Sequence, residues 1–226
     1  YFAEKKGIDP RKIVSVSVNP CTAKKAETKR EEENAAARYH NDESLGMDTD
    51  ISITTREFIR WIQEEHIDFN TVEESQFDDL IGMETGASII FGNTGGVMEA
   101  AMRTAYKLIT DKEPPPYALT HLEDVRGMEG VKEALLELNG RTLRIGVVSG
   151  LGNADDLIEK IKSGEEHFDF VEVMACPYGC IAGAGQPFCH KVDKKERIDG
   201  MYRSDKAAPI KRSEENPVIY TLYNNG

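Results

Sequence analysis

Long hydrophobic runs are missing from this sequence of 226 residues. No stretch approaches the roughly 20 apolar residues that a membrane-spanning helix needs, so membrane insertion is not expected. Cysteine is scarce, and four cysteines are too few for the dense disulfide scaffold of small secreted domains. Basic residues are also few, with 28 Lys and Arg against 40 Asp and Glu. A nucleic-acid partner is therefore not expected, because phosphate binding needs a basic face.

The composition that remains is that of a globular protein. Hydrophobic residues make up 39% and charged residues 30% of the chain, which suits one domain of moderate size or two small lobes. No secretion signal is recognisable, and the few cysteines suit a reducing compartment, so we expect a cytoplasmic protein. The first residue is Tyr1 rather than Met, and we interpret residues 1–226 as part of a longer protein.

The stretch Val171–Pro187 carries the most unusual chemistry of the chain. An apolar run, Phe168–Met174, predicts a buried strand, and Cys176 and Cys180 follow it with C-x3-C spacing. Ligands of open α/β sheets bind at the carboxyl ends of strands, and the glycines after Cys180 allow close backbone approach. The spacing is compatible with a metal or cluster site and equally with a pair of buried thiols.

A second predicted strand also ends in a cysteine. The alternating run Lys12–Val18 leads into Cys21, and Lys24 and Glu27 follow at steps of three residues. An ammonium near a thiolate can neutralise an anionic cluster, and a carboxylate at the rim of a site can transfer protons. The alternative for Lys24 and Glu27 is a solvated ion pair on the face of a helix.

A glycine-rich turn precedes a predicted helix at Val97–Thr110. The apolar run before it, Ser88–Phe91, turns through Gly92, Gly95 and Gly96. Such turns often hold an anion at the N-terminus of the helix, and the alternative is a tight strand-to-helix turn without a ligand.

The rest of the chain predicts strands that alternate with helices. Together these segments predict an α/β fold, a mostly parallel twisted sheet flanked by helices. The predicted elements are a charged loop or helical excursion at 28–50, a helix from Thr54 or Thr55 to about His66, a helix Val131–Asn139 ended by Gly140, a strand Leu143–Val148, a helix Asp156–Lys162 ended by Gly164, and a polar helical segment at 188–226 that closes with a helix Glu215–Asn225.

Three longer motifs carry a resemblance to a known family. They are P-C-T-A-K-K-A-E from Pro20, F-G-N-T-G-G-V-M-E-A-A-M-R from Phe91, and E-V-M-A-C-P-Y-G-C-I-A-G-A-G-Q-P from Glu172. In this order and spacing they resemble the catalytic domain of iron-only (di-iron) hydrogenases, and the resemblance covers essentially the whole chain. It implies the C-terminal part of that domain, from an enzyme that reversibly forms H2 from protons and electrons. The implied cofactor, the H-cluster, is a 4Fe–4S cluster joined to a di-iron subcluster.

The resemblance also implies a role for individual residues. The implied metal ligands are Cys21, Cys176 and Cys180, with Cys180 bridging the two parts of the cluster. Three residues are implied to be catalytic. Lys24 would hydrogen-bond a cyanide of the di-iron unit, Glu27 would lie on the proton path, and Met174 would line the di-iron pocket. The implied cofactor contacts are Phe91, Gly92, Gly185 and Gln186. The implied partners are the N-terminal remainder of the domain, a ferredoxin or similar electron carrier, and cluster maturation proteins.

The chain departs from the family pattern in several places. The family motif T-S-C-C-P, which supplies a further cluster ligand, does not occur, so we expect this polypeptide alone to be inactive. Asn19 stands where the family usually has Met, and Tyr178 where it usually has Gly. Cys189, beside His190, is interpreted as an ordinary thiol. A hydrogenase-like iron–sulfur assembly protein and a hydrogen-sensing regulator remain alternative interpretations.

Overall fold

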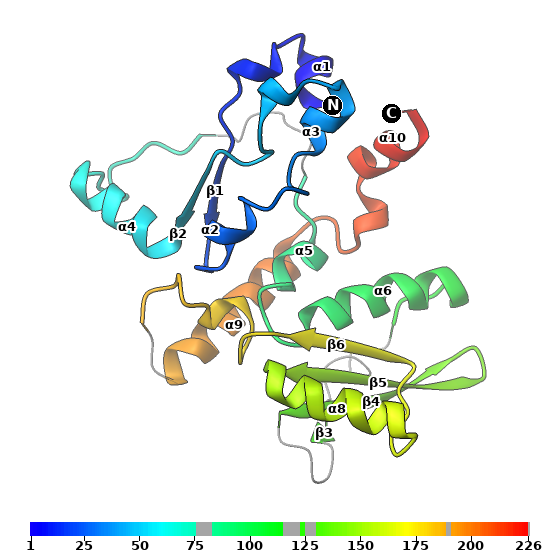
Figure 1. Cartoon of the computed structure of the whole chain (residues 1–226). Helices are drawn as coiled ribbons and strands as arrows, with labels where there is room; N and C mark the ends of the chain where they lie inside the picture. The colour runs from blue at the N-terminus through cyan, green and yellow to red at the C-terminus, as the bar shows by residue number, and fades with distance from the viewer. Residues whose placement is uncertain (76–82, 115–122, 125–129, 189–190, 226) are drawn as a thin grey trace. The chain divides into compact units, whose positions relative to one another are not determined.

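The computed structural model describes residues 1–75, 83–114, 123–124, 130–188 and 191–225 (Figure 1). The chain divides into two compact units, Tyr1–Gly82 with Gly183–Phe188, and Met83–Ala182 with Cys189–Gly226. None of the described helices combines the length and apolar content that crossing a membrane requires.

The first unit is built on a parallel pair of strands. β1 and β2 lie side by side, with Val16 opposite Ile51 and Asn19 opposite Thr54. The predicted strand at Lys12–Val18 is present only from Val16, because Lys12 belongs to a 3-10 helix and residues 13–15 belong to neither element. The elements of this unit are α1 (Phe2–Lys6), a 3-10 helix (Pro10–Lys12), β1 (Val16–Asn19), α2 (Lys24–Glu27), α3 (Ala35–His40), a 3-10 helix (Glu43–Leu45), β2 (Ile51–Thr54) and α4 (Thr55–Glu64).

A capping box starts α4 at Thr54, one of the two residues at which the sequence predicts the start of this helix. The Thr54 side chain accepts a hydrogen bond from the Glu57 N–H at 3.2 Å, and the Glu57 carboxylate accepts one from the Thr54 N–H at 2.7 Å. Two otherwise unsatisfied N–H groups at the helix start are thereby paired. The Lys25 ammonium, which donates to Glu57, and the Thr54 donors together hold the pKa of the Glu57 carboxyl at about 2.

The charged segment at 28–50 is a helical excursion rather than a featureless loop. It contains α3, whose first N–H groups lack a cap from the preceding Asn34. Asp48 replaces that cap, since its carboxylate accepts hydrogen bonds from the N–H groups of Ala35 and Ala36 at 2.7 and 2.9 Å. The segment therefore contains short helices between charged loop residues.

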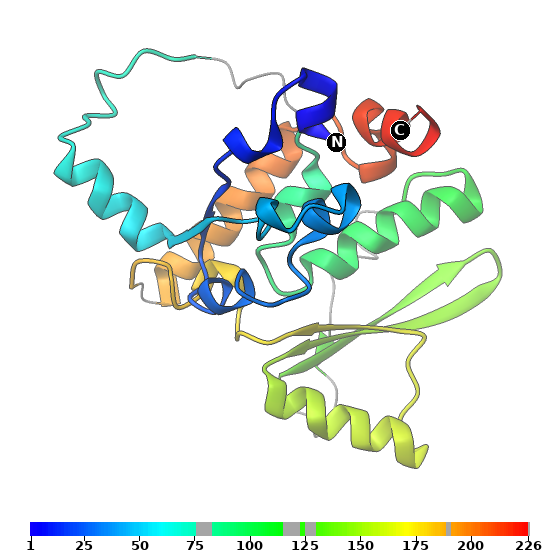
Figure 2. The same ribbon diagram turned by 45° about the horizontal axis from the view of Figure 1, so that its top comes forward.

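The second unit is a sheet covered by helices on both faces. Its strands lie in the order β3-β4-β5-β6, with β5 and β6 parallel and the other two pairings antiparallel. Figures 1 and 2 show α6 and α8 on opposite faces of this sheet. The predicted α/β class is confirmed, but this sheet, expected to be mostly parallel, has one parallel and two antiparallel pairings among the described strands. The elements are α5 (Gly86–Ile90), α6 (Gly96–Thr110), β3 (Glu123–Asp124), β4 (Val131–Leu138), β5 (Arg141–Ser149), α8 (Leu151–Ser163), β6 (Phe170–Met174), a 3-10 helix (Cys180–Ala182), α9 (Lys191–Ala207), a 3-10 helix (Ser213–Glu215) and α10 (Pro217–Asn225).

Alternate residues of β5 build the core on both faces of the sheet. Ile145 and Val147 pack with Met98 of α6, whereas Val148 packs with Leu157 of α8. All five side chains are buried, and alternation along the strand sends neighbours to opposite faces. The sheet and its two helices therefore form a three-layer core that fixes the position of β6.

The predicted helix at Val131–Asn139 is wrong, because this segment is the strand β4. Its buried residues alternate, and it forms an antiparallel hairpin with β5. The turn is Asn139–Gly140, where both residues have positive φ, 50° and 79°. Asn-Gly between two strands is a strong hairpin signal, and it was interpreted as the end of a helix.

The apolar run at Ser88–Phe91 is helical rather than extended. α5 begins after Thr85, whose side chain accepts a hydrogen bond from the Ser88 N–H at 3.2 Å. The chain therefore passes from one helix to the next through Gly92–Gly95, and the expected strand-to-helix turn is a helix-to-helix turn.

Candidate functional site

Cys21 follows β1 at the start of a short helical turn. Pro20, which has no N–H for the sheet, separates the strand from this cysteine. The thiol is half-buried, and α2 begins three residues later at Lys24. The strand-end position predicted for Cys21 is thus present in the first unit.

Lys24 and Glu27 form an ion pair on α2. The ammonium lies 2.6 Å from Glu27 Oε1, and both side chains are about half exposed. The hydrogen bond to Glu27, followed by the attraction of its charge, raises the pKa of Lys24 against the opposing effect of burial. The helix-face ion pair, which the sequence left open as the simpler interpretation, is therefore formed. A primary ammonium has three donors, and Glu27 takes one of them.

The segment after Cys180 returns to the first unit and packs on the Cys21 loop. Gly185 N–H donates to Pro20 O at 2.9 Å, and a Cβ atom at Gly185 would lie 2.8 Å from Cys21 N. Arg56 fixes the segment from the other side, since its N–H donates to Gly185 O at 3.0 Å. Gln186 follows, and its N–H donates to Gly183 O at 2.9 Å. Only glycine fits at position 185 without displacing the backbone that carries Cys21.

Asn19 is bound within the first sheet. Its Nδ2 donates to Ser17 Oγ at 3.0 Å and lies 3.4 Å from Ser52 Oγ. These hydroxyls hold the amide over the strands, so the polar substitution at this position has its own polar partners.

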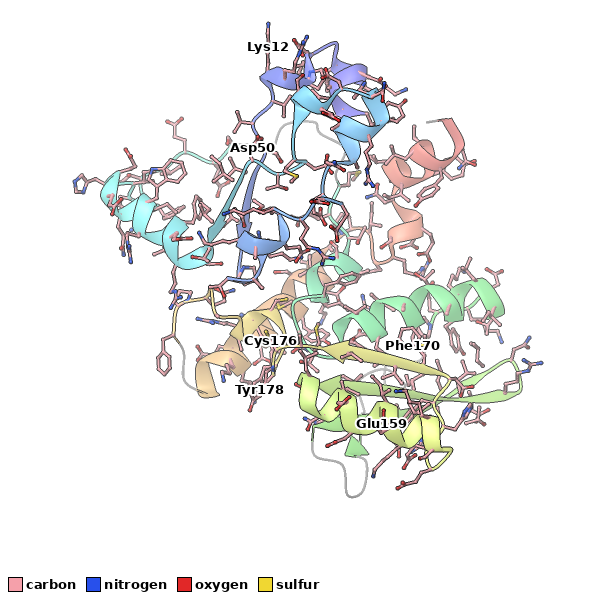
Figure 3. All side chains as sticks on the ribbon, in the orientation of Figure 1. Lys12, Asp50, Glu159, Phe170, Cys176 and Tyr178 are labelled. Atoms are coloured by element: carbon pink, nitrogen blue, oxygen red, sulfur yellow. The ribbon has the colours of Figure 1, made fainter. Side chains whose placement is uncertain are left out.

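Cys176 (Figure 3) and Cys180 follow β6 in the second unit, and both are exposed. Gly179 N–H donates to Cys176 O at 3.0 Å, which closes a β-turn with Pro177 in second and Tyr178 in third position. Tyr178 has a φ of 68°, the left-handed value that a type II turn requires there. Glycine adopts this value freely, whereas another residue loses about 1–2 kcal/mol. This backbone conformation suits the Gly that the resemblance leads us to expect at this position.

The cysteine turn packs against the glycine-rich turn before α6. A Cβ atom at Gly179 would lie 2.8 Å from Gly92 O and 2.9 Å from Thr94 N. Ile181 N–H, next to Cys180, donates to Gly92 O at 3.0 Å. Phe91 precedes this contact and is largely exposed. The glycine-rich turn and the cysteine turn, which are about 90 residues apart in sequence, therefore pack against each other next to Cys180.

Sequence reasoning missed Glu172, which joins β6, the strand before the cysteine turn, to the glycine-rich turn before α6. This residue of β6 is only 5% exposed. Its carboxylate accepts hydrogen bonds from Gly95 N–H at 2.7 Å and Met98 N–H at 2.6 Å, at the N-terminus of α6. The glycine-rich turn does hold an anion, and that anion is a side chain of the protein. An acidic residue inside an otherwise apolar strand was the signal.

A buried polar cluster supports α6 on the side of α9. Arg103 donates to Asp205 with both terminal nitrogens at 2.8 Å and pairs with Glu99, which also accepts from Tyr202 at 2.9 Å. The hydrogen bond to Asp205 is the main cause that raises the pKa of Arg103. The burial of Tyr202, followed by the charge of Glu99, raises the pKa of the phenol. These contacts fix α9 to α6.

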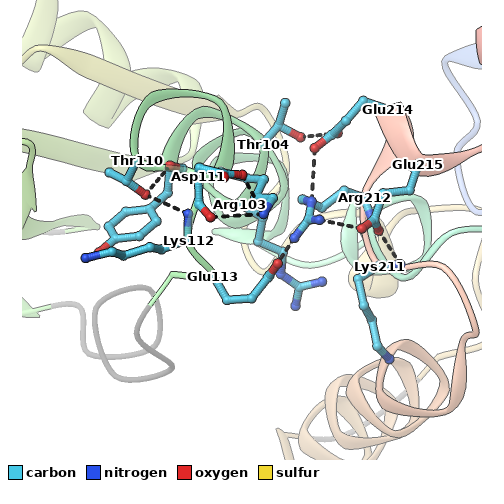
Figure 4. Close-up of polar contacts among 12 residues, drawn as sticks. Arg103, Thr104, Thr110, Asp111, Lys112, Glu113, Lys211, Arg212, Glu214 and Glu215 are labelled. Atoms are coloured by element: carbon cyan, nitrogen blue, oxygen red, sulfur yellow. Dashed lines mark hydrogen bonds and ion pairs between the residues drawn. The ribbon is translucent and has the colours of Figure 1, made fainter.

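The buried Arg212 is the centre of a second polar cluster in this unit (Figure 4). Its guanidinium pairs with three carboxylates, those of Glu113, Glu214 and Glu215. The Nε atom lies 3.0 Å from Glu214 Oε1 but makes no directed hydrogen bond. Because α10 follows directly, this cluster fixes the start of the C-terminal helix.

The remaining predicted residues have different outcomes. Met174 is the last residue of β6, two positions before Cys176. Cys189 and His190 lie outside the described residues. No three His, Cys, Asp or Glu side chains of the described segments gather into a group that could hold one metal ion. Cys21 belongs to the first unit, and Cys176 and Cys180 belong to the second.

Two family descriptions match the chain. Residues 1–184 match the family described as "Iron only hydrogenase large subunit, C-terminal domain". Residues 191–225, which contain α9 and α10, match the family described as "Iron hydrogenase small subunit".

Individual relatives give the same result. The NADP-reducing hydrogenase subunit HndD of Solidesulfovibrio fructosivorans is 44% identical over 99% of this chain, which spans 36% of that protein. The periplasmic [Fe] hydrogenase large subunit of Nitratidesulfovibrio vulgaris is 40% identical over 83% of this chain and 42% of its own. A solved structure of apo [FeFe]-hydrogenase HydA1 from Chlamydomonas reinhardtii matches all of this chain and 61% of its own, with a TM-score of 0.80 and 38% identity.

A second group of relatives has a different name. The cytosolic iron-sulfur assembly component 3 of Mus musculus is 29% identical over 99% of this chain and 46% of its own length. The chain thus spans less than half of each of these curated relatives.

Proposed function

Because the chain belongs to the C-terminal domain family of the iron-only hydrogenase large subunit, we propose that its full-length protein is a hydrogenase, which reversibly forms H2 from protons and electrons. The observation that carries this proposal is the pair of cysteine-bearing strand ends, one in each unit, each followed by a turn that another backbone segment holds. The relatives named hydrogenase at 40–44% identity support it over the alternatives.

We propose Cys21, Cys176 and Cys180 as ligands of a 4Fe–4S cluster, with Cys180 also bridging to a di-iron subcluster. The donor chemistry fits, because thiolates are the usual ligands of iron–sulfur clusters, and the two cysteines after β6 are exposed. Gly179 and Gly185 fit as well. Each lies beside a cysteine and lacks a side chain, so another backbone segment can pack closely against it. Once bound, the cluster supplies the electron transfer and the iron at which hydrogen reacts.

The side chains of α2 have two roles in this proposal. Lys24 is proposed to donate a hydrogen bond to an anionic cyanide ligand, using a donor that is not directed at Glu27. Glu27, paired with Lys24 at 2.6 Å and about half exposed, is proposed to transfer protons between solvent and the site. Its exposure and its contact with the ammonium support this assignment.

The pocket walls are proposed from the residues nearest to the cysteines. Met174 ends the strand that leads to Cys176, and Gly92 accepts the hydrogen bond from Ile181 N–H. We propose that Met174, Phe91 and Gly92 line the di-iron subcluster, and that Gly185 and Gln186 contact the cofactor beside Cys21.

The proposed partners include the rest of the same catalytic domain. The apolar face of the first sheet supports this, because Val16 and Val18 are 50% and 45% exposed among the described residues. A two-stranded pair with an open apolar face needs further structure to bury it. A ferredoxin or similar electron carrier and cluster maturation proteins complete the proposed partners. A cytoplasmic location stays a prediction, and one relative is named periplasmic.

The second candidate function is iron–sulfur assembly, which the relatives at 29% identity support. Tyr178 and Asn19, where hydrogenases usually have Gly and Met, also leave open a hydrogen-sensing regulator with little turnover. The candidates differ in the rate of hydrogen evolution, which a hydrogenase sustains and an assembly protein or a sensor does not.

Hydrogen evolution by the full-length protein tests the proposal. The protein is matured anaerobically with the di-iron unit and supplied with a reduced low-potential electron donor. We expect sustained turnover that the substitution Cys180→Ala abolishes. A fully loaded protein that makes no hydrogen would reject the catalytic function and favour assembly or sensing.

A further inference from the structure

The cysteine turn is held in a conformation that its own sequence disfavours. Tyr178 has a φ of 68° and Gly179 a φ of 78°, so two consecutive residues of the turn are left-handed. Glycine accepts this conformation, whereas tyrosine shifts the equilibrium towards a turn in which the 177–178 peptide is flipped. Such a flip would move the backbone that joins Cys176 to Cys180.

The downstream end of the turn is fixed by backbone contacts. Gly179 lies against Gly92 and Thr94, and Ile181 N–H donates to Gly92 O at 3.0 Å. Arg197 of α9 also donates to Ile181 O at 2.9 Å. These contacts hold Gly179 and the residues after it, and they do not act on the tyrosine side chain.

The Tyr178 ring also has a partner on α9, the helix that carries Arg197. The Lys194 ammonium lies over the Tyr178 ring, 4.4 Å from its centroid. This distance is within the range of a cation–π interaction, and the strained residue is the one whose ring it contacts. Lys194 belongs to α9, the segment that matches the small-subunit family, whereas Tyr178 belongs to the large-subunit match.

We propose that Lys194 and Tyr178 are positioning residues, which together hold the Cys176–Gly179 turn in its left-handed form and so fix the spacing of the two cysteines for the cluster. This inference rests on the proposed function only for the identity of the cluster. In this chain, a contact from α9 provides what a glycine at position 178 would provide by itself.

Amide hydrogen exchange in the full-length protein without its cluster tests the contact directly. The reporter is the Gly179 N–H, because its bond to Cys176 O exists only when the turn is closed. We expect Lys194→Met to lower the protection of this amide by about 2- to 5-fold, the factor that corresponds to an exposed cation–π interaction. Lys194→Arg should restore protection, and the neighbouring substitution Lys195→Met should leave it unchanged.

A double substitution separates the proposed contact from a general effect on α9. In the Tyr178→Gly background no strained residue remains, so Lys194→Met should no longer change the protection of Gly179. An equal loss of protection in both backgrounds, or no loss in either, would overturn the inference.

The cluster gives a second readout in the full-length protein. Electron paramagnetic resonance of the reduced 4Fe–4S cluster should change with Lys194→Met and return to the original spectrum with Lys194→Arg. An unchanged spectrum with Lys194→Met would overturn the positioning role. Absence of the signal from the unsubstituted protein would instead refute the proposed function, while the exchange measurement would still stand.

Discussion

Replacement of Glu172 by Gln removes the charge that joins β6 to α6. In the native protein the buried carboxylate accepts two backbone hydrogen bonds, from Gly95 and Met98, at 2.7 and 2.6 Å. Hydrogen bonds to a charged group contribute about 1.5–3 kcal/mol each. The amide keeps one acceptor oxygen but turns its NH2 group towards the other N–H, and it no longer complements the helix dipole. We therefore expect a loss of about 2–4 kcal/mol.

Two probes separate this effect from changes elsewhere. The single tryptophan, Trp61, lies in the first unit. The urea midpoint that its fluorescence reports should therefore differ little between Glu172→Gln and the native protein. Hydrogen exchange at the Gly95 and Met98 amides reports on the second unit, where protection should fall by about 30- to 700-fold. Glu172→Asp keeps the charge and should give a smaller loss.

The matched control is Glu159→Gln on α8. Glu159 accepts a hydrogen bond from Lys162 at 2.9 Å, but its side chain is largely exposed. Exposed pairs contribute about 0–1 kcal/mol. If Glu172→Gln reduced protection at α6 no more than Glu159→Gln does, the assignment of Glu172 as the anion of the glycine-rich turn would be refuted.

Four further substitutions test other parts of the structure. Gly140→Ala should lower the stability by about 1 kcal/mol in thermal unfolding, because φ is 79° and no atom lies near the added Cβ, whereas Gly152→Ala in α8 should raise it. The folded-state pKa of Glu57, about 2, lies below its ordinary 4.5, so its stabilising contribution is present above pH 4.5 and is lost as the pH falls towards 2. Glu57→Gln should remove this dependence of stability on pH. An unchanged acid-unfolding profile would contradict the capping role. Lys24→Ala in the full-length protein should shift the infrared bands of bound cyanide and weaken capture of the di-iron unit by about 1.5–3 kcal/mol, and unchanged bands and occupancy would show that Lys24 does not contact it.

The sequence was sufficient for the features that depend on local patterns. The strand ends before Cys21 and Cys176, the Thr54 cap and the helix end at Gly164 were all predicted, because each depends on a few adjacent residues. The helix at Val97–Thr110 was predicted for the same reason, and it starts one residue earlier.

Features that depend on tertiary contacts were not predictable in this way. The leucines and glutamates of β4 favour a helix, and the pairing with β5 overrides that preference. The role of Glu172 depends on a turn about 75 residues away. The left-handed conformation of Tyr178 is one that tyrosine disfavours, so no local pattern indicates it.

The most direct test of the proposed cluster site is to count its cysteine ligands. In the full-length protein, reconstituted anaerobically, each of the substitutions Cys21→Ser, Cys176→Ser and Cys180→Ser should reduce the 4Fe–4S signal in Mössbauer spectra, whereas Cys189→Ser should leave the signal unchanged. If any of the first three variants kept the full signal, that residue would not be a ligand. A full signal in all three would contradict the site and the function proposed from it.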